Sequence, residues 1–528
     1  MTQLHGKNLI AGTLSDAAAH FTATSPLDGS TLEGNFAMAT AADVDAAMLG
    51  AAAASGAFAA ATGEQRAALL ERIAEEIEAL GDALLERAHQ ETALPLARLT
   101  GERGRTVGQL RLFAAAARDG RWADPRIDRA MPDRQPLPRP DLRRAKRPLG
   151  PVVVFGSSNF PLAFSVAGGD TASALCTGNP VVVKAHRAHP GTSELVGSAI
   201  AKAVAACGLP AGIFSMLHGE GSVMGIALVR HPATRAVGFT GSRAAGRALC
   251  DAAAARPDPI PVFAEMSSLN PVFLLPGALA ERGAGIAQGF VASMTLGVGQ
   301  FCTKPGLVFA VEGPDLDAFE AGVAEGVTAA PAASMLTPDI LRAYSAGCEH
   351  LASLPQATTL AAATAKAEPA HTQAAARVVK TDVASFLADP GYAEEVFGPA
   401  SLIVTAASAE ELRTVAARLE GQLTATVHGT ADDLAVAADL LEILATRAGR
   451  VIVNGFPTGV EVCHAMQHGG PWPATSDSRF TSVGSAALER FVRPVCYQDV
   501  PDALLPDALK DANPLGLERL VNGVRGTH

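Results

Sequence analysis

One cysteine has a sequence context that suits nucleophilic catalysis. Cys302 lies in the segment GVGQFCT at residues 297–303, where two glycines allow the backbone to approach a ligand closely. A thiolate at this position could attack a carbonyl carbon while its own backbone N–H faces the developing oxyanion. Most cysteines are simply small buried hydrophobes, and the Ala-rich surroundings of Cys176, Cys207 and Cys250 favour that interpretation for those three.

Two polar residues follow apolar runs that are typical of buried strands. Glu265 ends the run 262–264 and precedes small residues, so a carboxylate would emerge into an apolar site. Burial would raise the pKa of that carboxylate, which suits a general base. Asn159 follows the strand-like run 152–155 in a turn, where its amide could donate to an oxyanion. Taken alone, each also fits an ordinary turn residue.

A coenzyme site is indicated at other strand ends, although no G-x-G-x-x-G fingerprint follows a predicted strand. Gly238, Thr240, Gly241 and Ser242 lead from a strand into a helix whose N-terminal N–H groups could hold a pyrophosphate. Lys184 ends the run of valines at 181–183, where its ammonium could reach a ribose or a phosphate. The alternatives are a helix cap for Ser242 and a solvated strand end for Lys184.

The elements that would position these residues are those of an α/β protein. With 528 residues, of which 48% are hydrophobic, the chain exceeds one ordinary core. Residues 40–120 have helical periodicity, and from residue 148 short apolar strands alternate with helices, for example the helix expected at 163–175. A Pro-rich stretch at 125–140 predicts a connector or arm, and the C-terminal tail predicts a strand at 493–497 with a helix-like end.

The net charge of −11 argues against a nucleic-acid-binding surface. No apolar stretch has the ~20 residues of a membrane helix, and the N-terminus lacks an apolar leader. Seven scattered cysteines form no C-x-x-C pair, so neither a zinc site nor a disulfide framework is expected. We therefore expect a cytoplasmic enzyme without a bound metal.

Together these segments resemble the aldehyde dehydrogenase superfamily, in the right order from about residue 20 to residue 500. The similar segments are SNFP at 158–161, VKA at 183–185, GFTGS at 238–242, QFCT at 300–303 and EEVFGP at 394–399. In the last of these, Glu395 would hold the nicotinamide ribose and Phe397 would pack near the ring. The resemblance implies an aldehyde dehydrogenase-like α/β fold. It comprises a Rossmann-type coenzyme domain (1–124 and 148–261), a catalytic domain (262–455) and oligomerisation or arm segments (125–147 and 479–528).

The resemblance also implies a mechanism. Cys302 attacks the aldehyde, Asn159 and the Cys302 N–H hold the oxyanion, and hydride transfer to NAD(P)⁺ leaves a thioester that water activated by Glu265 hydrolyses. Members that favour NAD⁺ often carry a glutamate where this chain has Arg187, which could accept a 2′-phosphate. NADP⁺ is therefore expected to be tolerated or preferred, and the enzyme to be a homodimer or homotetramer.

The chain departs from most members at 266–270 (MSSLN) and at 455–460 (GFPTGV). A branch that includes 2,5-dioxovalerate (α-ketoglutaric semialdehyde) dehydrogenases and bacterial NADP-dependent fatty aldehyde dehydrogenases shares these departures, and residues 92–95 look most like the first group. A keto-acid semialdehyde carries a carboxylate, for which Arg105 is the predicted clamp. By the same analogy Phe160, Val460 and Cys463 would line the substrate tunnel. If the tunnel is apolar, a medium- or long-chain fatty aldehyde is the alternative.

Two other classes of protein stay open from the sequence. A cysteine hydrolase or acyltransferase would pair Cys302 with a histidine, but neither His464 nor His468 has a context that ties it to Cys302. A catalytically silent member of the same fold is the second, and the presence of Cys302, Glu265 and Asn159 argues against it.

Overall fold

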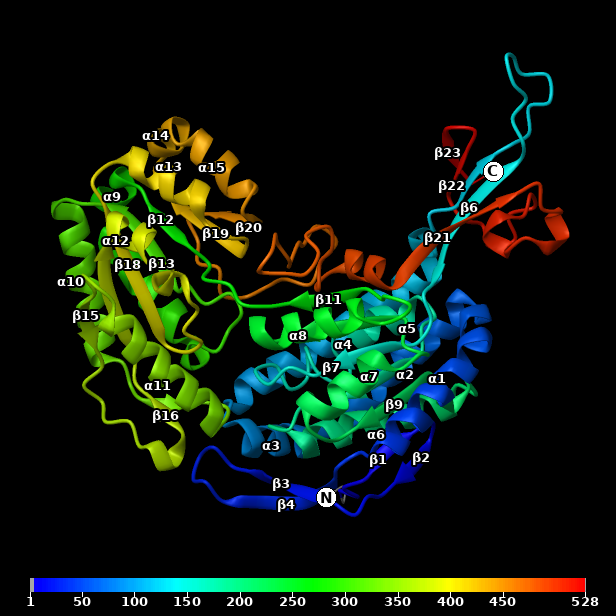
Figure 1. Cartoon of the computed structure of the whole chain (residues 1–528), viewed down its shortest axis with the longest axis horizontal. Helices are drawn as coiled ribbons and strands as arrows, with labels where there is room; N and C mark the ends of the chain where they lie inside the picture. Colours follow the sequence, from blue (N-terminus) through cyan, green and yellow to red (C-terminus); the bar gives the residue numbers. More distant parts are fainter. Residues whose placement is uncertain (1–3, 528) are drawn as a thin grey trace.

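The structure, a computed structural model, describes residues 4–527 of the chain. Residues 1–3 and 528, which fall in the predicted coenzyme domain and arm, lie outside this part. Figure 1 shows two α/β lobes that meet near β11, and an arm of strands that projects from the larger lobe. The site residues therefore have to come together where the two lobes face each other.

Helices occupy residues 41–119, as the periodicity predicts. Thr40 and Thr62 each begin a helix with a capping box, in which the threonine side chain and the third helical residue satisfy each other's backbone N–H groups. Leu69, Ile73 and Ile77 recur at a spacing of four and are fully buried. The four helices are α1 (Ala41–Ala60), α2 (Gly63–Ala79), α3 (Gly81–Thr92) and α4 (Leu96–Asp119).

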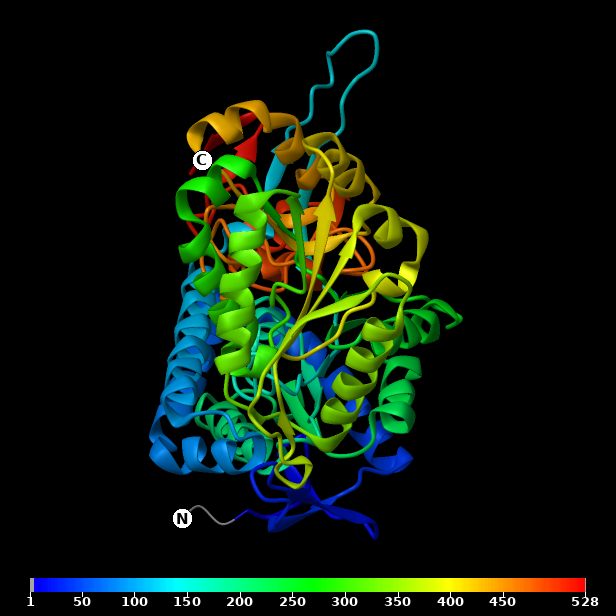
Figure 2. The same cartoon turned by 90° about the vertical axis from the view of Figure 1, so that its left-hand side faces the viewer.

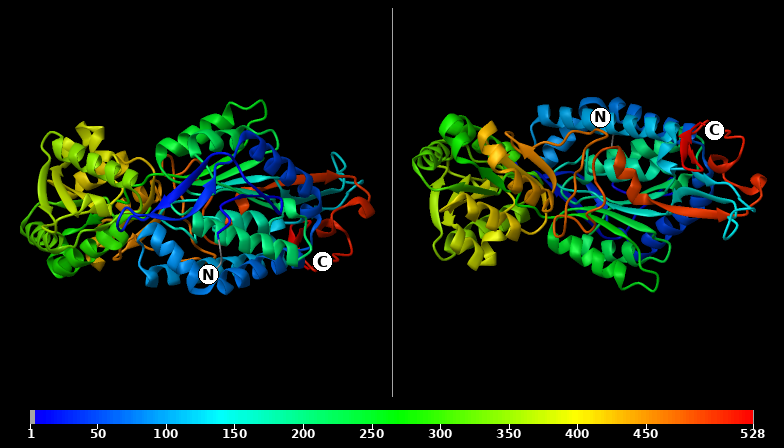
Figure 3. Two further views of the ribbon diagram at one scale, coloured as in Figure 1. Left: turned by 90° about the horizontal axis from the view of Figure 1, so that it is seen from below. Right: turned by 90° about the horizontal axis from the view of Figure 1, so that it is seen from above.

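The first lobe is built on a seven-stranded sheet of order β11-β10-β7-β8-β9-β1-β2. Its first five strands are parallel, and their valine-rich runs are buried because helices cover both faces (Figure 3). The strands are β1 (Asn8–Ile10), β2 (Thr13–Ser15), β7 (Val152–Phe155), β8 (Val181–Lys184), β9 (Phe214–Leu217), β10 (Ala236–Thr240) and β11 (Val262–Glu265). The helices are α5 (Gly169–Cys176), α6 (Pro190–Ala206), α7 (Ile226–Arg230) and α8 (Arg243–Ala254); a hairpin, β3 (His20–Thr24) and β4 (Thr31–Ala37), lies beside the lobe.

The second lobe has its own seven-stranded sheet, of order β15-β17-β18-β13-β12-β19-β20, in which only the edge strand β15 is antiparallel. Its strands are β12 (Val272–Leu274), β13 (Leu307–Val311), β15 (Thr358–Ala362), β17 (Arg377–Asp382), β18 (Ala400–Ala406), β19 (Gln422–His428) and β20 (Ala448–Val453). Its helices are α9 (Pro276–Thr295), α10 (Pro314–Ala329), α11 (Pro338–Ser353), α12 (Val383–Ala388), α13 (Ala409–Arg418), α14 (Ala431–Val436) and α15 (Ala438–Ala445). A two-stranded ribbon, β14 (Ala333–Ser334) and β16 (Gln373–Ala374), completes it.

The arm is a five-stranded sheet of order β21-β6-β5-β22-β23. It joins residues far apart in the sequence: β5 (Arg126–Asp128), β6 (Leu142–Pro148), β21 (Val492–Gln498), β22 (Arg519–Val521) and β23 (Val524–Gly526). The cyan loop between β5 and β6 extends beyond the rest of the molecule in Figures 1 and 2. The Pro-rich stretch is thus an arm, and the strand predicted at 493–497 is confirmed as part of β21.

Three expectations about elements are wrong. Strand β11 pairs with β10 in the first sheet, so the two sheets divide after Glu265 rather than at residue 262. The helix expected at 163–175 begins only at Gly169; residues 161–168 form turns, and the Glu102 carboxylate accepts the N–H groups of Leu162 and Ala163 there. The helix-like end is limited to two single 3-10 turns, Asp502–Leu504 and Asp507–Leu509, and the chain then forms the hairpin β22–β23.

Within residues 4–527, none of the helices combines the length and the apolar character that crossing a membrane requires.

Candidate active site

The nucleophile loop is held between the two sheets by one asparagine. Asn270, which has a positive φ of 50°, lies in the link between β11 and β12. Its side-chain amide donates to the carbonyl oxygens of Cys302 at 2.8 Å and Lys304 at 3.0 Å. Its own oxygen accepts from the hydroxyls of Ser268 and Thr424, both at 3.0 Å. The unusual MSSLN segment thus fixes the backbone at the cysteine and two residues beyond it.

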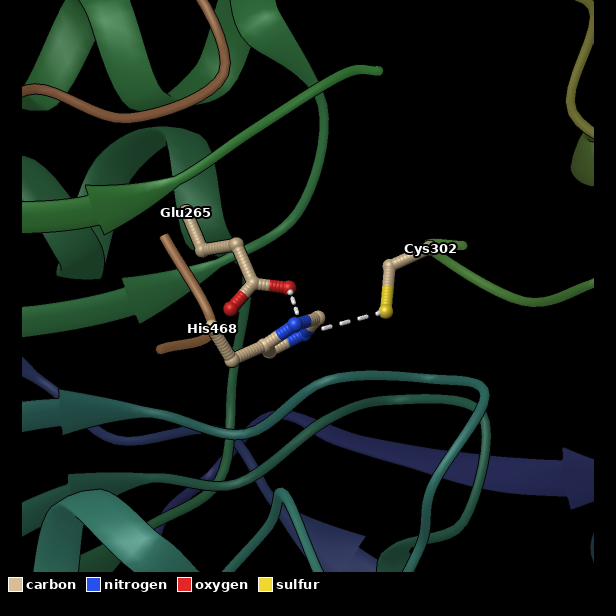
Figure 4. Close-up of side chains that lie close together, drawn as sticks. All are labelled: Glu265, Cys302 and His468. Carbon is tan, nitrogen blue, oxygen red and sulfur yellow. Dashed lines mark hydrogen bonds and ion pairs between the residues drawn. The ribbon is translucent and has the colours of Figure 1, made fainter. Parts of the chain in front are cut away.

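Cys302, Glu265 and His468 converge at the junction of the lobes, as Figure 4 shows. The Nε2 atom of His468 lies 3.4 Å from Sγ of Cys302 and 3.0 Å from Oε1 of Glu265. The second carboxylate oxygen of Glu265 accepts a hydrogen bond from the Ser482 hydroxyl at 2.5 Å. The expectation that no histidine can be tied to Cys302 is therefore wrong for His468.

His468 reaches this position because the coil after β20 crosses back to the first lobe (Figure 1). The backbone of Met266 donates to Ala474 at 2.8 Å, and Ser476 donates to Ala264 at 3.0 Å, so this coil runs beside β11. The backbone N–H of His468 itself donates to the hydroxyl of Thr481 at 2.8 Å. His468 and Glu265 are buried, with 1% and 3% of their side chains exposed, so solvent screens their interaction weakly.

The ionisation of the two catalytic candidates is coupled. Burial raises the pKa of the Cys302 thiol well above its ordinary value, and the Glu265 carboxylate raises it further, whereas Arg105 opposes the rise. Burial alone would also raise the pKa of Glu265, as predicted from the sequence. The net pKa of Glu265 is lowered instead, because the His468 imidazole and the Ser482 hydroxyl stabilise the carboxylate. These opposite shifts favour a protonated thiol on Cys302 and an ionised carboxylate on Glu265 in the resting site.

Asn159 lies beside the nucleophile segment. It is buried, and its amide donates to the carbonyl oxygen of Gln300 at 3.1 Å. Its own carbonyl accepts from Nη2 of Arg98 at 2.7 Å. The guanidinium of Arg98 lies over the rings of Phe160 and Phe301, 5.0 and 4.7 Å from the centroids. The backbone of Asn159 is therefore fixed. Of the two hydrogens on its side-chain amide, which is predicted to hold the oxyanion, one is bound to Gln300 and the other stays available.

One face of α4 points at the site. Arg98, Glu102 and Arg105 are spaced by four and three residues, so they share a face. Arg105 lies over Phe160 and Phe164 (5.9 and 5.3 Å to the centroids), and its Nε and Nη2 atoms are buried without a hydrogen-bond partner. Nη1 of Arg98 is likewise buried and unpaired. The coil residue Glu461 is one of the anions acting on Arg105.

A cavity of about 1080 Å³ runs from the carboxyl ends of the first sheet to Cys302. Of the predicted coenzyme residues, it is lined by Lys184, Arg187, Thr240, Gly241, Ser242, Glu395 and Phe397. Cys302, Glu265 and Asn159 line it too. Gly238 does not; a Cβ there would lie 2.8 Å from the carboxylate of Asp170, so its small size serves packing.

The donors in this cavity fit a nicotinamide dinucleotide. The ammonium of Lys184 makes no hydrogen bond within the described residues, and burial lowers its pKa to about 8. The hydroxyl of Ser157 also lacks a partner. The side chain of Ser242 accepts from the N–H of Ala245 at 3.3 Å, so Ser242 is a helix cap of α8, as the alternative interpretation of the sequence had it. Ser242 also lines the cavity, so the N-terminus of α8 opens into it. These unsatisfied groups at strand ends match ribose and phosphate oxygens.

The EEVFGP segment is packed on the nucleophile loop. A Cβ on Gly299 would lie 2.3 Å from the carbonyl carbon of Gly398, so only glycine permits this contact. The buried ammonium of Lys304 donates to the carbonyls of Val396 at 3.1 Å and Ala400 at 2.6 Å, and burial lowers its pKa to about 8. Burial raises the pKa of Glu395. The segment that carries the predicted nicotinamide-ribose residue Glu395 is therefore packed directly against the loop that carries Cys302.

Among the predicted substrate residues, Phe160 lies between Phe164 and Phe301, with centroids 5.4 and 5.5 Å away. Val460 and Cys463 are partly exposed on the coil after β20, and their place in a tunnel stays a prediction. The sequence analysis missed His468, Asn270, Arg98 and Lys304. Only Arg98 left a signal, namely its spacing of seven residues from Arg105 on one helix.

The fold and the site define a class of enzyme: a cysteine nucleophile and a carboxylate base at the mouth of a dinucleotide-type cavity. The aldehyde dehydrogenase family model matches residues 14–492, and the chain belongs to this family. It is an NAD(P)-dependent enzyme that oxidises aldehydes through a cysteine, as predicted, and not a cysteine hydrolase.

Two relatives are similar over nearly the whole chain. The α-ketoglutaric semialdehyde dehydrogenase 2 of Azospirillum brasilense is 58% identical over 523 residues, 99% of each chain. The α-ketoglutaric semialdehyde dehydrogenase of Acinetobacter baylyi is 50% identical over 490 residues, 93% of this chain and 92% of the relative. Among solved structures, the γ-glutamyl-γ-aminobutyraldehyde dehydrogenase of Burkholderia cenocepacia has a TM-score of 0.79 at 23% identity, covering 94% of this chain and 97% of its own. It confirms the predicted fold.

The coupling between Glu265 and Cys302 predicts a shifted pH profile. In Glu265→Gln the negative charge that opposes ionisation is lost, so the pKa of Cys302 falls and alkylation by iodoacetamide sets in at lower pH, since the thiolate is the reactive form. Mass spectrometry of the peptide containing Cys302 over about pH 6–10 measures this, against an ordinary thiol pKa of about 8.5. The exposed Glu394→Gln is the control. An unchanged or more alkaline profile for Glu265→Gln would contradict the coupling.

Asn159→Ala removes the predicted side-chain donor to the oxyanion and should lower kcat by about 100-fold. Circular dichroism should show an unchanged fold, because the Asn159 carbonyl that Arg98 binds belongs to the backbone. Asn522→Ala in the arm serves as the control. A kcat within about threefold of the wild type would remove Asn159 from the reaction.

Proposed function

We propose that this enzyme oxidises 2,5-dioxovalerate, an aldehyde that carries a 2-keto carboxylate, to 2-oxoglutarate. The observation that carries the proposal is the set of buried guanidinium nitrogens without a hydrogen-bond partner beside the nucleophile, namely Nη1 of Arg98 and Nε and Nη2 of Arg105. A buried cation without a partner is costly, and a substrate carboxylate would satisfy it. The two relatives similar over nearly the whole chain are named for the same semialdehyde.

In the proposed reaction, Sγ of Cys302 attacks the aldehyde carbon and forms a hemithioacetal, and the thiol proton passes to Nε2 of the nearby neutral His468, so the Glu265 carboxylate stays ionised. The Asn159 amide and the Cys302 N–H hold the oxyanion. When bound, the nicotinamide supplies the hydride acceptor. Glu265 then takes a proton from the water that hydrolyses the Cys302 thioester.

His468 gives this site a proton path that the sequence motifs do not contain. Its Nε2 atom is within reach of both the sulfur and the carboxylate, so one imidazole can receive the thiol proton and stay beside the base. Ser482 holds the other carboxylate oxygen and limits rotation of Glu265. The base therefore acts from a fixed position.

Substrate selection follows from α4. The rings of Phe160 and Phe164 carry the Arg105 guanidinium by cation–π contacts, which leaves its Nε and Nη2 hydrogens available for a carboxylate. A fatty aldehyde, the alternative substrate, would leave these buried N–H groups of Arg98 and Arg105 without an acceptor, which disfavours it.

NADP⁺ is the proposed preferred coenzyme, with NAD⁺ as a second substrate. Arg187 lines the cavity, lies over the Phe21 ring at 5.0 Å and pairs with Glu220 at 3.0 Å. Its guanidinium is about half exposed, so it can turn from Glu220 to a 2′-phosphate without losing a buried contact.

A cytoplasmic homodimer or homotetramer is the proposed working form. The seven cysteines are unpaired, which suits a reducing compartment that also keeps Cys302 active. The arm exposes the apolar side chains of Leu137, Leu504 and Val524, which a second copy of the chain could cover.

The substrate proposal predicts a selective loss in Arg105→Ala. Its kcat/KM for 2,5-dioxovalerate should fall by about 100-fold or more, because two charge-assisted hydrogen bonds to the substrate are lost. Its kcat/KM for decanal should stay the same or rise. NAD(P)H formation at 340 nm measures both, and the exposed Arg111→Ala is the control. Faster turnover of decanal than of dioxovalerate by the wild type would overturn the substrate proposal.

The coenzyme proposal predicts that Arg187→Ala raises KM for NADP⁺ roughly tenfold, the value of one exposed charge-assisted contact, and leaves KM for NAD⁺ nearly unchanged. Initial rates with each coenzyme measure the ratio, with the exposed Arg230→Ala as the control. Equal effects on both coenzymes would mean that Arg187 does not contact the 2′-phosphate.

A further inference from the structure

We propose that the triad Glu265–Cys302–His468 is also a binding site for a zinc-type cation, which reversibly inhibits the enzyme. Metal ligands in proteins are commonly Cys, His, Asp and Glu side chains. Within the described residues 4–527, this is the one group of three such side chains whose donor atoms lie within 4.8 Å of one another. The proposal concerns the catalytic centre itself and does not depend on which aldehyde is oxidised.

The donor spacing suits a small tetrahedral cation. Ligand atoms around tetrahedral zinc, at about 2.0–2.3 Å from the metal, lie about 3.3–3.6 Å apart. In this site Nε2 of His468 is 3.4 Å from Sγ of Cys302 and 3.0 Å from Oε1 of Glu265. A shift of a few tenths of an ångström brings the carboxylate to the required separation.

The donor types select the metal. A thiolate, an imidazole and a carboxylate favour Zn²⁺ and Co²⁺ over Mg²⁺ and Ca²⁺, which prefer oxygen ligands. The thiolate and the carboxylate together balance the charge of the cation. Three protein ligands with a fourth position on the cavity side leave room for one water molecule.

A second observation points to a ligand at this place. Oε1 of Glu265 is buried and faces His468 Nε2 at 3.0 Å without a hydrogen bond of normal geometry, while Oε2 is held by the Ser482 hydroxyl. A carboxylate with one oxygen fixed from behind and the other turned towards further donor atoms is arranged as a metal ligand with a supporting hydrogen bond. Glu265 and Cys302 line the 1080 Å³ cavity, which provides the entry path.

Bound metal would stop both halves of the reaction. It occupies the sulfur lone pair that attacks the aldehyde and the carboxylate oxygen that activates water. Because no bond to carbon forms, a chelator that removes the metal restores the thiol and the base.

The test is a titration of the full-length, substrate-free enzyme with Co²⁺ in thiol-free buffer. A thiolate ligand gives a sulfur-to-cobalt charge-transfer band in the near ultraviolet, and tetrahedral geometry gives visible bands. We expect a one-to-one endpoint and loss of the band in Cys302→Ser. In His468→Gln and in Glu265→Gln, we expect affinity at least about 10- to 100-fold weaker. His464→Gln and Cys250→Ser, which leave the triad intact, should bind as the wild type does.

A second measurement needs no variant. Zn²⁺ should protect Cys302 of the wild type from iodoacetamide, and EDTA should restore both alkylation and dehydrogenase activity. A charge-transfer band that persists in Cys302→Ser, wild-type affinity in both His468→Gln and Glu265→Gln, or alkylation at an undiminished rate with Zn²⁺ would each overturn the proposal. Failure of the substrate proposal would instead appear only in the comparison of aldehydes.

Discussion

The hydrogen bonds of the Asn270 side chain hold the catalytic loop to the framework of both lobes. A single amide satisfies the carbonyls of Cys302 and Lys304, and its oxygen is anchored by Ser268 and by Thr424 of β19. Buried backbone carbonyls must be paired, so moving this loop away from Asn270 would leave two carbonyls without partners. The catalytic loop is also joined to the coenzyme side of the cavity. Gly299 packs against Gly398, and the Lys304 ammonium donates to the carbonyls of Val396 and Ala400.

The ionisation of Cys302 and Glu265 depends on the charged and polar groups that lie close to them. Glu265 keeps its ionised form because His468 and Ser482 stabilise it, and in doing so it holds the Cys302 thiol in the protonated, unreactive form. Arg105 acts in the opposite direction on the same thiol. A substrate carboxylate that neutralised Arg105 would alter this balance, so substrate binding and nucleophile ionisation are linked electrostatically rather than independent.

The sequence predicted the features that depend on local residue patterns. Short apolar runs ending in Glu265, Lys184 and Thr240 became buried parallel strands, and their last residues meet at one edge as the topology requires. It could not predict His468, which is 166 residues from Cys302, nor the lowered pKa of Glu265, which depends on that neighbour. The assignment of β11 to the first sheet was missed because strand pairing is a tertiary property that the local sequence around residue 262 does not reveal.

The crossing coil of residues 468–482 has a consequence for biosynthesis. His468 lies 166 residues after Cys302, so the ribosome makes the nucleophile before its proton acceptor. A nascent chain that ends between the two carries Cys302 without His468. Dehydrogenase chemistry in the proposed mechanism therefore requires that this later segment has been made and has docked beside β11.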